Sequence, residues 1–358
     1  MSDNDKAILD KRVSKHTAFT IDTKELSDYL KKSGGAGQFR LRIDRDMDWT
    51  IDLELNDLRT PDFRIEYITP EGTFECKEPF VVNTYHGRTS TGLPVAFTID
   101  ENTFFGIIFS ENYYYTIRPA MDFTQNRADR SFIVYHSWNI IPDEKYSHFI
   151  HDAIQATEDK KELMEQSRNT TCDYVLRIAT VADADFYDIH KAKTSSEIIS
   201  TINAVSAIYK AQITNLKLMI CNQFIYTVNP PQYYSSDITT LMNDFRNYWK
   251  SNHTNIERNV AHLFTGKTLT YLNYISNFLG ISWGPDAPFF GQFGIGNNLG
   301  YSISMNHASS TAIIAHEIGH NLTATHPDST CNCYCNNNKT ATIMCPLLTS
   351  SKNLWFCQ

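Results

Sequence analysis

The sequence lacks three features that would place it in common protein classes: a basic stripe, a long apolar run and an apolar leader. It carries 32 basic and 40 acidic residues among 358, a formal net charge of −8. Binding to nucleic-acid phosphates needs clustered basic residues, and no charge cluster here supplies them, so nucleic acid is excluded as a partner. No apolar run approaches the roughly 20 residues that a membrane-spanning helix needs.

The first residues, MSDNDKAILDKR, are polar and lack the apolar core of a secretory signal. Two readings remain: a cytosolic protein, or a secreted or cell-surface protein whose export signal is absent from this sequence. The cysteines favour export. Five of the eight crowd into the last 28 residues, in a loop-like, Asn-rich segment more typical of disulfides than of free thiols: Cys331, Cys333, Cys335, Cys345 and Cys357. A second, structural zinc site is the alternative, but the usual C-x2-C pairs are missing.

The pattern of apolar residues divides the chain into three parts. Residues 1–140 are predicted as a β-rich unit, because runs such as QFRLRI and WTIDLEL alternate apolar and polar side chains and no long helical pattern appears within residues 38–136. Residues 141–171 are polar and charged, which predicts an exposed connector. Residues 172–358 mix helical and strand patterns. The predicted fold class is therefore α+β.

Two helices are predicted in the last part, each from a spacing of three and four between apolar residues. The first, SSEIISTINAVSAIYKAQI, places on one face Ile198, Ile202, Val205 and Tyr209. The second begins at a cap, Ser236 or Asp237, and turns inward Ile238, Leu241, Phe245 and Trp249. CDYVLRIATVAD and LKLMIC are predicted strands that flank the first helix.

The segment AIIAHEIGHNLTATH, residues 312–326, carries three histidines and a glutamate at metal-ligand spacing. In a helix, His316 and His320 lie one turn apart on the same face, with Glu317 beside them. A catalytic zinc needs three protein ligands and an open position for water. A tight turn can bring His326 to the same ion, and no glutamate follows Glu317 that could replace it. The sequence predicts one zinc held by the three histidines; calcium stays open as a further ion that no motif indicates.

With these residues the chain resembles the metzincin metalloproteases, and within them the reprolysin (adamalysin) group and its bacterial relatives. The resemblance rests on HEIGHNLTATH, on ATIMCP at 341–346, where Met344 stands as the Met-turn methionine, and on ERNVAHLFTGKTL at 257–269. It covers about residues 172–358. FRLRIDRDMDWTIDLELNDL, in the β-rich part, looks like the propeptides that precede such bacterial catalytic domains. One position departs from the pattern, because Thr323 stands where metzincins place glycine.

The resemblance implies a metzincin catalytic domain with a twisted mixed sheet, an active-site helix and a Met-turn. It implies a monomeric endopeptidase that hydrolyses protein or peptide substrates. Glu317 would take a proton from the zinc-bound water and pass it to the leaving amine, and Met344 would form an apolar floor beneath the imidazoles. Related proteases add the substrate to an edge strand. That strand is predicted at residues 300–304: Gly300, Tyr301, Ser302, Ile303 and Ser304.

A β-rich unit ahead of an open zinc site suggests a zymogen, in which the front domain fills the cleft. A thiolate or a carboxylate is the natural blocking ligand. Cys76 is the only cysteine of the front domain and the candidate for a cysteine switch; an aspartate, or pairing of Cys76 with another cysteine, is the alternative. An activating protease would then cut the connector, preferably after Arg168, with Lys160 and Lys161 as competing sites.

Two other functions fit the motif. One is a catalytically silent binding or adhesion protein that keeps a metalloprotease fold, against which the retained Glu317 argues. The other is a non-proteolytic zinc hydrolase such as an amidase.

Overall fold

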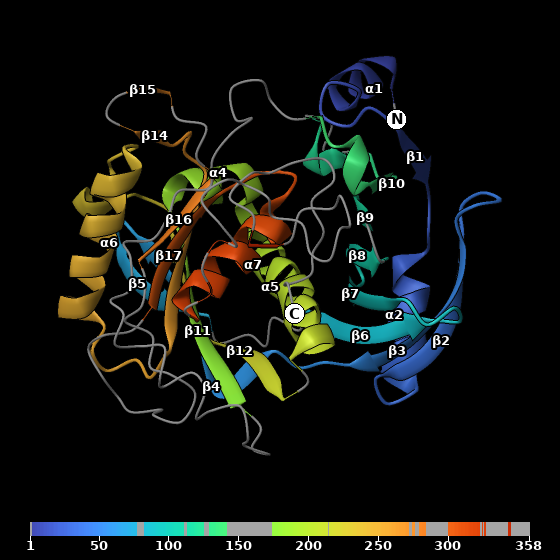
Figure 1. Ribbon diagram of the computed structural model, residues 1–358, viewed down its shortest axis with the longest axis horizontal. Coiled ribbons are helices and arrows are strands. Elements are labelled where there is room, and N and C mark those ends of the chain that lie inside the picture. The colour runs from blue at the N-terminus through green and yellow to red at the C-terminus, as the bar shows by residue number, and fades with distance from the viewer. Residues whose placement is uncertain are drawn as a thin grey trace.

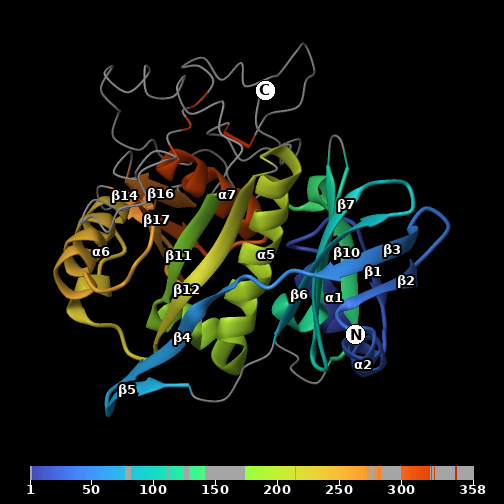
Figure 2. The same ribbon diagram turned by 90° about the horizontal axis from the view of Figure 1, so that it is seen from below.

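The computed structural model describes residues 2–76, 82–110, 113–124, 129–141, 174–213, 215–271, 274–275, 279–283, 300–322, 324, 326 and 343–344. Within these ranges the chain forms two large β-sheets with a long helix between them (Figures 1 and 2). We call residues 2–141 the front unit and residues 174–344 the second unit.

An eight-stranded antiparallel sheet forms the front unit, with strand order β1-β10-β9-β8-β7-β6-β3-β2. A helix covers one face of this sheet: Trp49, Ile51 and Leu53, which alternate with polar residues, are buried against Leu26 and Leu30 of that helix. Its strands are β1 (His16–Phe19), β2 (Ala36–Arg42), β3 (Asp48–Leu55), β6 (Asn83–Thr89), β7 (Pro94–Asp100), β8 (Thr103–Phe109), β9 (Tyr114–Pro119) and β10 (Phe132–His136). Its helices are α1 (Asp3–Leu9), α2 (Thr23–Lys32), η1 (Ala120–Asp122) and η2 (Ser137–Asn139). The predicted β-rich front part is confirmed.

A seven-stranded mixed sheet forms the second layer, with strand order β16-β17-β13-β11-β12-β4-β5. Five neighbours run parallel: β17 (Gly300–Met305), β13 (Val260–Thr265), β11 (Tyr174–Ala182), β12 (Leu216–Tyr226) and β4 (Arg59–Thr69). Two short strands pair antiparallel at the edges, β16 (Gly280–Trp283) and β5 (Gly72–Glu75). A separate hairpin joins β14 (Thr270–Tyr271) to β15 (Tyr274–Ile275).

Strands β4 and β5 belong to the front part of the sequence but to the sheet of the second unit. In the front sheet β3 is paired with β6, and the chain between them leaves that sheet to place β4 beside β12. The alternation of FRIEYIT predicts a strand, but it carries no information about which strand is its partner.

Helices cover both faces of the seven-stranded sheet (Figure 1). On one face α6 (Ile238–Asn252), capped by Asp237, buries the predicted side chains together with Tyr301 and Ile303 of β17. On the other face lie α5 (Thr194–Gln212), α7 (Ser310–Asn321), α4 (Ala184–His190) and the short turn η6 (Lys191–Lys193). The short turn η7 (Pro231–Tyr233) packs against α6. Both predicted helices are confirmed. None of the helices in the described ranges is long and apolar enough to cross a membrane.

Helix α5 is covered on two sides, which its sequence pattern did not predict. The expected face, with Ile198 and Ile202, packs into a core cluster to which both units contribute. The opposite face contacts β6, β7 and β8 of the front sheet (Figure 2). There the Asn203 side-chain amide donates to the carbonyls of Tyr85 (3.3 Å) and Phe97 (2.9 Å), so polar groups of the helix are satisfied by the front sheet.

A group of buried charges also joins the two units. Arg118 of β9 donates to Glu197 of α5 at 2.6 Å and to Asp122 of η1 at 3.2 Å, and its side chain is only 10% exposed. Burial is the largest single influence on Glu197 and acts to raise its pKa, but Arg118, His190 and Lys193 together lower it. At Asp122 burial dominates and raises the pKa. One cation thus serves two carboxylates, and the pairing fixes the position of η1 and β9 against α5.

We expect acid to destabilise the fold because two histidines are buried in neutral form. Burial lowers the pKa of His86 to about 4 and that of His262 to about 3, from 6.5. Between pH 6.5 and the folded-state pKa the unfolded chain binds the proton and the folded chain does not, so stability falls as pH falls. At pH 5 each of the two histidines lowers the free energy of unfolding by about 2 kcal/mol relative to neutral pH.

Urea unfolding at pH 7.5 and 5.0, with a metal chelator present so that metal binding does not contribute, measures this difference. His86→Gln should reduce the pH dependence. Equal free energies of unfolding at the two pH values would contradict the assignment.

Candidate metal centre

The predicted metal-binding motif lies on α7, which packs against β16, β17 and α5. Residues 311–321 of this helix are all buried, in keeping with the apolar run AIIA before the first histidine. The Tyr209 hydroxyl of α5 donates to the Ala315 carbonyl at 2.8 Å, directly before His316. The helix that carries the motif is therefore held by core packing on several sides.

Three imidazole nitrogens converge at one point. The Nε2 atoms of His316 and His320 are 2.9 Å apart, those of His320 and His326 are 3.1 Å apart, and those of His326 and His316 are 3.2 Å apart. Three nitrogens around a tetrahedral zinc, at the usual Zn–N length, are separated by about 3.3 Å. The three side chains therefore fit one zinc ion, and they form a group able to hold a metal within the described part of the chain.

The other ring nitrogen of two of these histidines donates to a backbone carbonyl. His316 Nδ1 donates to the Ile343 carbonyl, and His320 Nδ1 donates to the Ala324 carbonyl, both at 2.8 Å. A proton on Nδ1 leaves the lone pair on Nε2, which is the tautomer that a metal needs. The Ala324 N–H in turn donates to the Gly319 carbonyl at 2.9 Å, which ends the helix and turns the chain toward His326. Thr323 itself lies outside the described residues.

Glu317 lies beside the histidines and is fully buried. Its Oε1 atom faces Gly280, the first residue of β16: a Cβ built on Gly280 would lie 2.8 Å from Oε1 and 2.9 Å from Ile313 Cγ2. Only glycine leaves room for the carboxylate at this place. Sequence reasoning missed Gly280, because nothing local to GISWG indicates that a glutamate from a distant helix approaches its backbone.

Met344 is buried in the core of the second unit, with Ile314 and Ile318 of α7. The residue before it, Ile343, supplies the carbonyl that orients His316. Ile343 and Met344 thus lie in the core cluster that includes residues of the motif helix, and the place of Met344 beneath the imidazoles stays a prediction.

The predicted edge strand is wrong. β17, which contains Gly300, Tyr301, Ser302, Ile303 and Ser304, is paired on both sides, with β13 and with β16. Within the described residues β16 is outermost on that side. The alternation in GYSISMN correctly predicts a strand. Whether that strand lies at the edge of the sheet depends on GISW, which forms β16 beside it and is too short to be predicted as a strand from its pattern.

Asn321 is another residue that the sequence did not single out. Its side-chain amide donates to the carbonyls of Trp283 and Tyr301 (3.1 Å each) and fixes α7 to both strands.

The cysteine switch at Cys76 stays a prediction, which the place of this residue in the sheet does not support. Cys76 follows β5, at the opposite edge of the sheet from the strands under α7, and its N–H donates to Ile65 of β4. β5 lies five strand spacings from β17, about 24 Å away. Arg168 and the five cysteines near the C-terminus lie outside the described residues, so the cleavage site and disulfides stay predictions.

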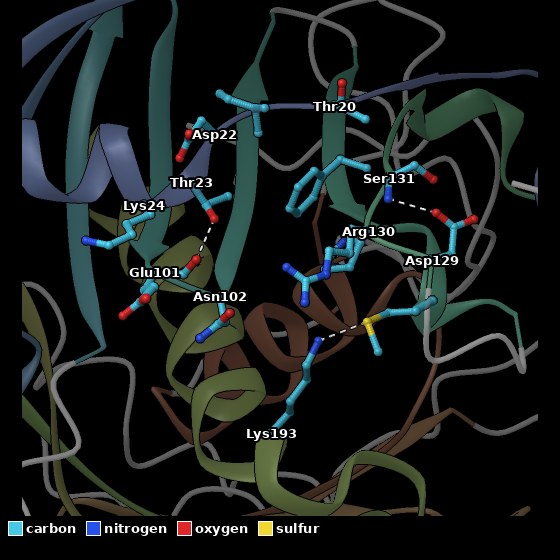
Figure 3. Close-up of a pocket in the computed structure, with 14 residues that line it drawn as sticks. Thr20, Asp22, Thr23, Lys24, Glu101, Asn102, Asp129, Arg130, Ser131 and Lys193 are labelled. Carbon is cyan, nitrogen blue, oxygen red and sulfur yellow. Dashed lines mark hydrogen bonds between the residues drawn. The ribbon is translucent and has the colours of Figure 1, made fainter.

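A cavity of about 770 Å³ lies at the seam between the front sheet and η6 and includes none of the metal-binding residues (Figure 3). Its lining mixes basic and acidic side chains: Lys24, Arg130 and Lys193 with Asp22, Glu101 and Asp129. The cavity is therefore separate from the histidine cluster, and its lining is neither mainly basic nor mainly acidic.

Comparisons with known proteins agree with this geometry. Residues 172–356, just over half of the chain, match the family model for metallo-peptidase family M12 of the reprolysin type. The fold is similar to the crystal structure of metalloproteinase-II from Bacteroides fragilis, with a TM-score of 0.58 and 15% identity, covering 93% of this chain and 92% of that one. No curated protein matches the sequence. The match to the family model shows that the chain belongs to metallo-peptidase family M12 and is a metzincin-type metalloprotease.

Proposed function

We propose that the chain is a latent zinc endopeptidase that is secreted or displayed at the cell surface. The observation that carries the proposal is the convergence of His316, His320 and His326 on one point, with Glu317 buried beside them. A zinc ion held there would lower the pKa of a bound water and polarise a substrate carbonyl.

Residues of the chain would supply the proton transfer and the orientation of the metal ligands. The Glu317 carboxylate would accept the proton of the attacking water and return it to the amine of the leaving peptide. Gly280 gives that carboxylate its space, and the carbonyls of Ile343 and Ala324 hold two of the imidazoles in the required tautomer.

Substrate would bind along β16 in place of the predicted β17. The Leu279 carbonyl accepts a hydrogen bond from the Met305 N–H of β17 at 2.8 Å. In an antiparallel pair, residues bonded to the neighbouring strand alternate with residues whose N–H and C=O point the other way. Gly280 and Ser282 would therefore direct their backbone groups toward an extended peptide added at this edge.

Latency is supported by the extent of contact between the two units. The front unit packs on α5, the helix that also contacts α7. We infer that an activating protease cuts within residues 142–171, with Arg168 the preferred site.

Replacing the proposed base should abolish hydrolysis without loss of metal. In Glu317→Gln the side chain keeps its volume but no longer accepts a proton, so we expect kcat of the activated enzyme to fall about 10²–10⁴-fold. Peptide cleavage and metal content of the same preparation measure this, with the exposed Glu71→Gln as the matched control. A zinc-loaded wild type that cleaves no peptide would instead favour a silent binding protein.

The contact between Gly280 and Glu317 gives a second test. In Gly280→Ala the added methyl group displaces the carboxylate, and because a shift of about 1 Å can cost about 100-fold, we expect kcat to fall about 10- to 100-fold. Metal content should stay unchanged. An activated variant with wild-type kcat would show that the carboxylate does not need this space.

Proteolysis should activate the protein. Extended trypsin treatment that removes residues ahead of the second unit should raise peptidase activity with zinc bound, because the proposed inhibitory unit is then gone. Arg168→Ala should slow this activation if that bond is cut first. Removal of the front unit with no gain in hydrolysis argues against latency.

A further inference from the structure

The β4–β5 hairpin, residues 59–75, is an arm that the front unit extends across the second unit (Figure 2). The front sheet does not need it: β3 and β6 are direct partners, with Leu55 opposite Tyr85, and the Asn56 N–H donates to the Thr84 carbonyl at 2.8 Å. A short turn after Asn56 could therefore join the two strands. The chain instead makes a long excursion to the far edge of another sheet.

The arm is bound by strand pairing along β12. The pairing runs from Arg59 opposite Ile220 to Ile68 opposite Tyr226, and it is extended by bonds from Ile220 N–H to the Leu58 carbonyl (2.6 Å) and from Thr227 N–H to the Ile68 carbonyl (2.9 Å). These backbone bonds continue a sheet whose other strands all belong to the second unit.

Side chains strengthen this attachment. Ile65 is 5% exposed and lies in the core cluster that contains Ile178 and Ile220 of the second unit. Asp62 accepts from Arg177 of β11 at 2.8 Å. The arm thus contributes an apolar anchor and an ion pair in addition to its backbone bonds.

The other surface shared by the two units combines apolar and polar contacts. Ala96, Phe105 and Ile107 of the front sheet lie in the same buried core cluster as apolar residues of α5. Beside them are the Arg118–Glu197 pair and the amide of Asn203 bonded to two carbonyls of the front sheet. The arm therefore acts together with a second surface that also holds the two units.

We propose that the arm retains the front unit on the second unit after the connector is cut, so that activation takes two steps: cleavage, then undocking or destruction of the arm. The proposal rests on the latency proposed above. A single cut within 142–171 breaks one covalent link and removes none of the contacts along β12 or α5. The nicked protein is therefore a non-covalent complex of the two units, still inhibited.

The experiment uses the full chain with a recognition sequence for a site-specific protease inserted in the connector. After complete cutting at micromolar concentration, both fragments should co-elute in gel filtration, and peptidase activity should stay within about twofold of the uncut protein. Separation of the wild-type fragments on cutting would overturn the proposal.

A matched pair of variants tests the arm itself. Ile65→Asp places a charge in the core only while the arm is docked, whereas Phe74→Asp changes a residue of the same arm that is 53% exposed. After cutting, the Ile65→Asp fragments should separate and activity should rise at least tenfold over the cut wild type, while Phe74→Asp should behave as wild type. Retention of the Ile65→Asp fragments, or equal release by both variants, contradicts the role of the arm.

Should uncut Ile65→Asp fail to fold, replacing residues 57–83 by a two-residue turn between Asn56 and Thr84 removes the arm while keeping the β3–β6 pair. Its fragments should separate on cutting. Co-elution is measured without any hydrolysis, so an inactive second unit would contradict the proposed function and leave the retention result intact.

Discussion

The metal centre depends on two hydrogen bonds from imidazole to backbone. His316 and His320 each donate Nδ1–H to a carbonyl, and those carbonyls belong to segments that follow α7 in the sequence, at Ile343 and Ala324. The bonds set the tautomer and orient the rings toward the point where three Nε2 atoms meet. The segment containing Met344 therefore contributes to the centre through its backbone as well as through an apolar side chain.

Local periodicity predicted the parts of the fold that local sequence controls. The apolar faces of α5 and α6, the cap at Asp237 and the one-turn spacing of His316 and His320 all follow from residues close together in the chain. The metal ligands could be named for the same reason, because a helix and one turn bring them together.

Contacts between distant segments could not be predicted in this way. The second buried face of α5 depends on a sheet formed more than 80 residues earlier, and the position of β16 outside β17 depends on pairing across a long intervening segment. Cys76 was a candidate because it is the only cysteine of the front domain, but the partner of β4, and hence the place of Cys76, is set by non-local pairing.

The outermost strand of the arm has a consequence for the molecule in solution. Glu75 of β5 stands directly opposite Glu66 of β4, and burial together with this facing carboxylate raises the pKa of Glu66. All four residues of β5 are exposed, so the strand is a free sheet edge of the kind that invites pairing between molecules. The edge is only four residues long, and the two facing carboxylates repel a further strand that carries negative charge. Both features discourage fibre-like stacking of one copy on the next.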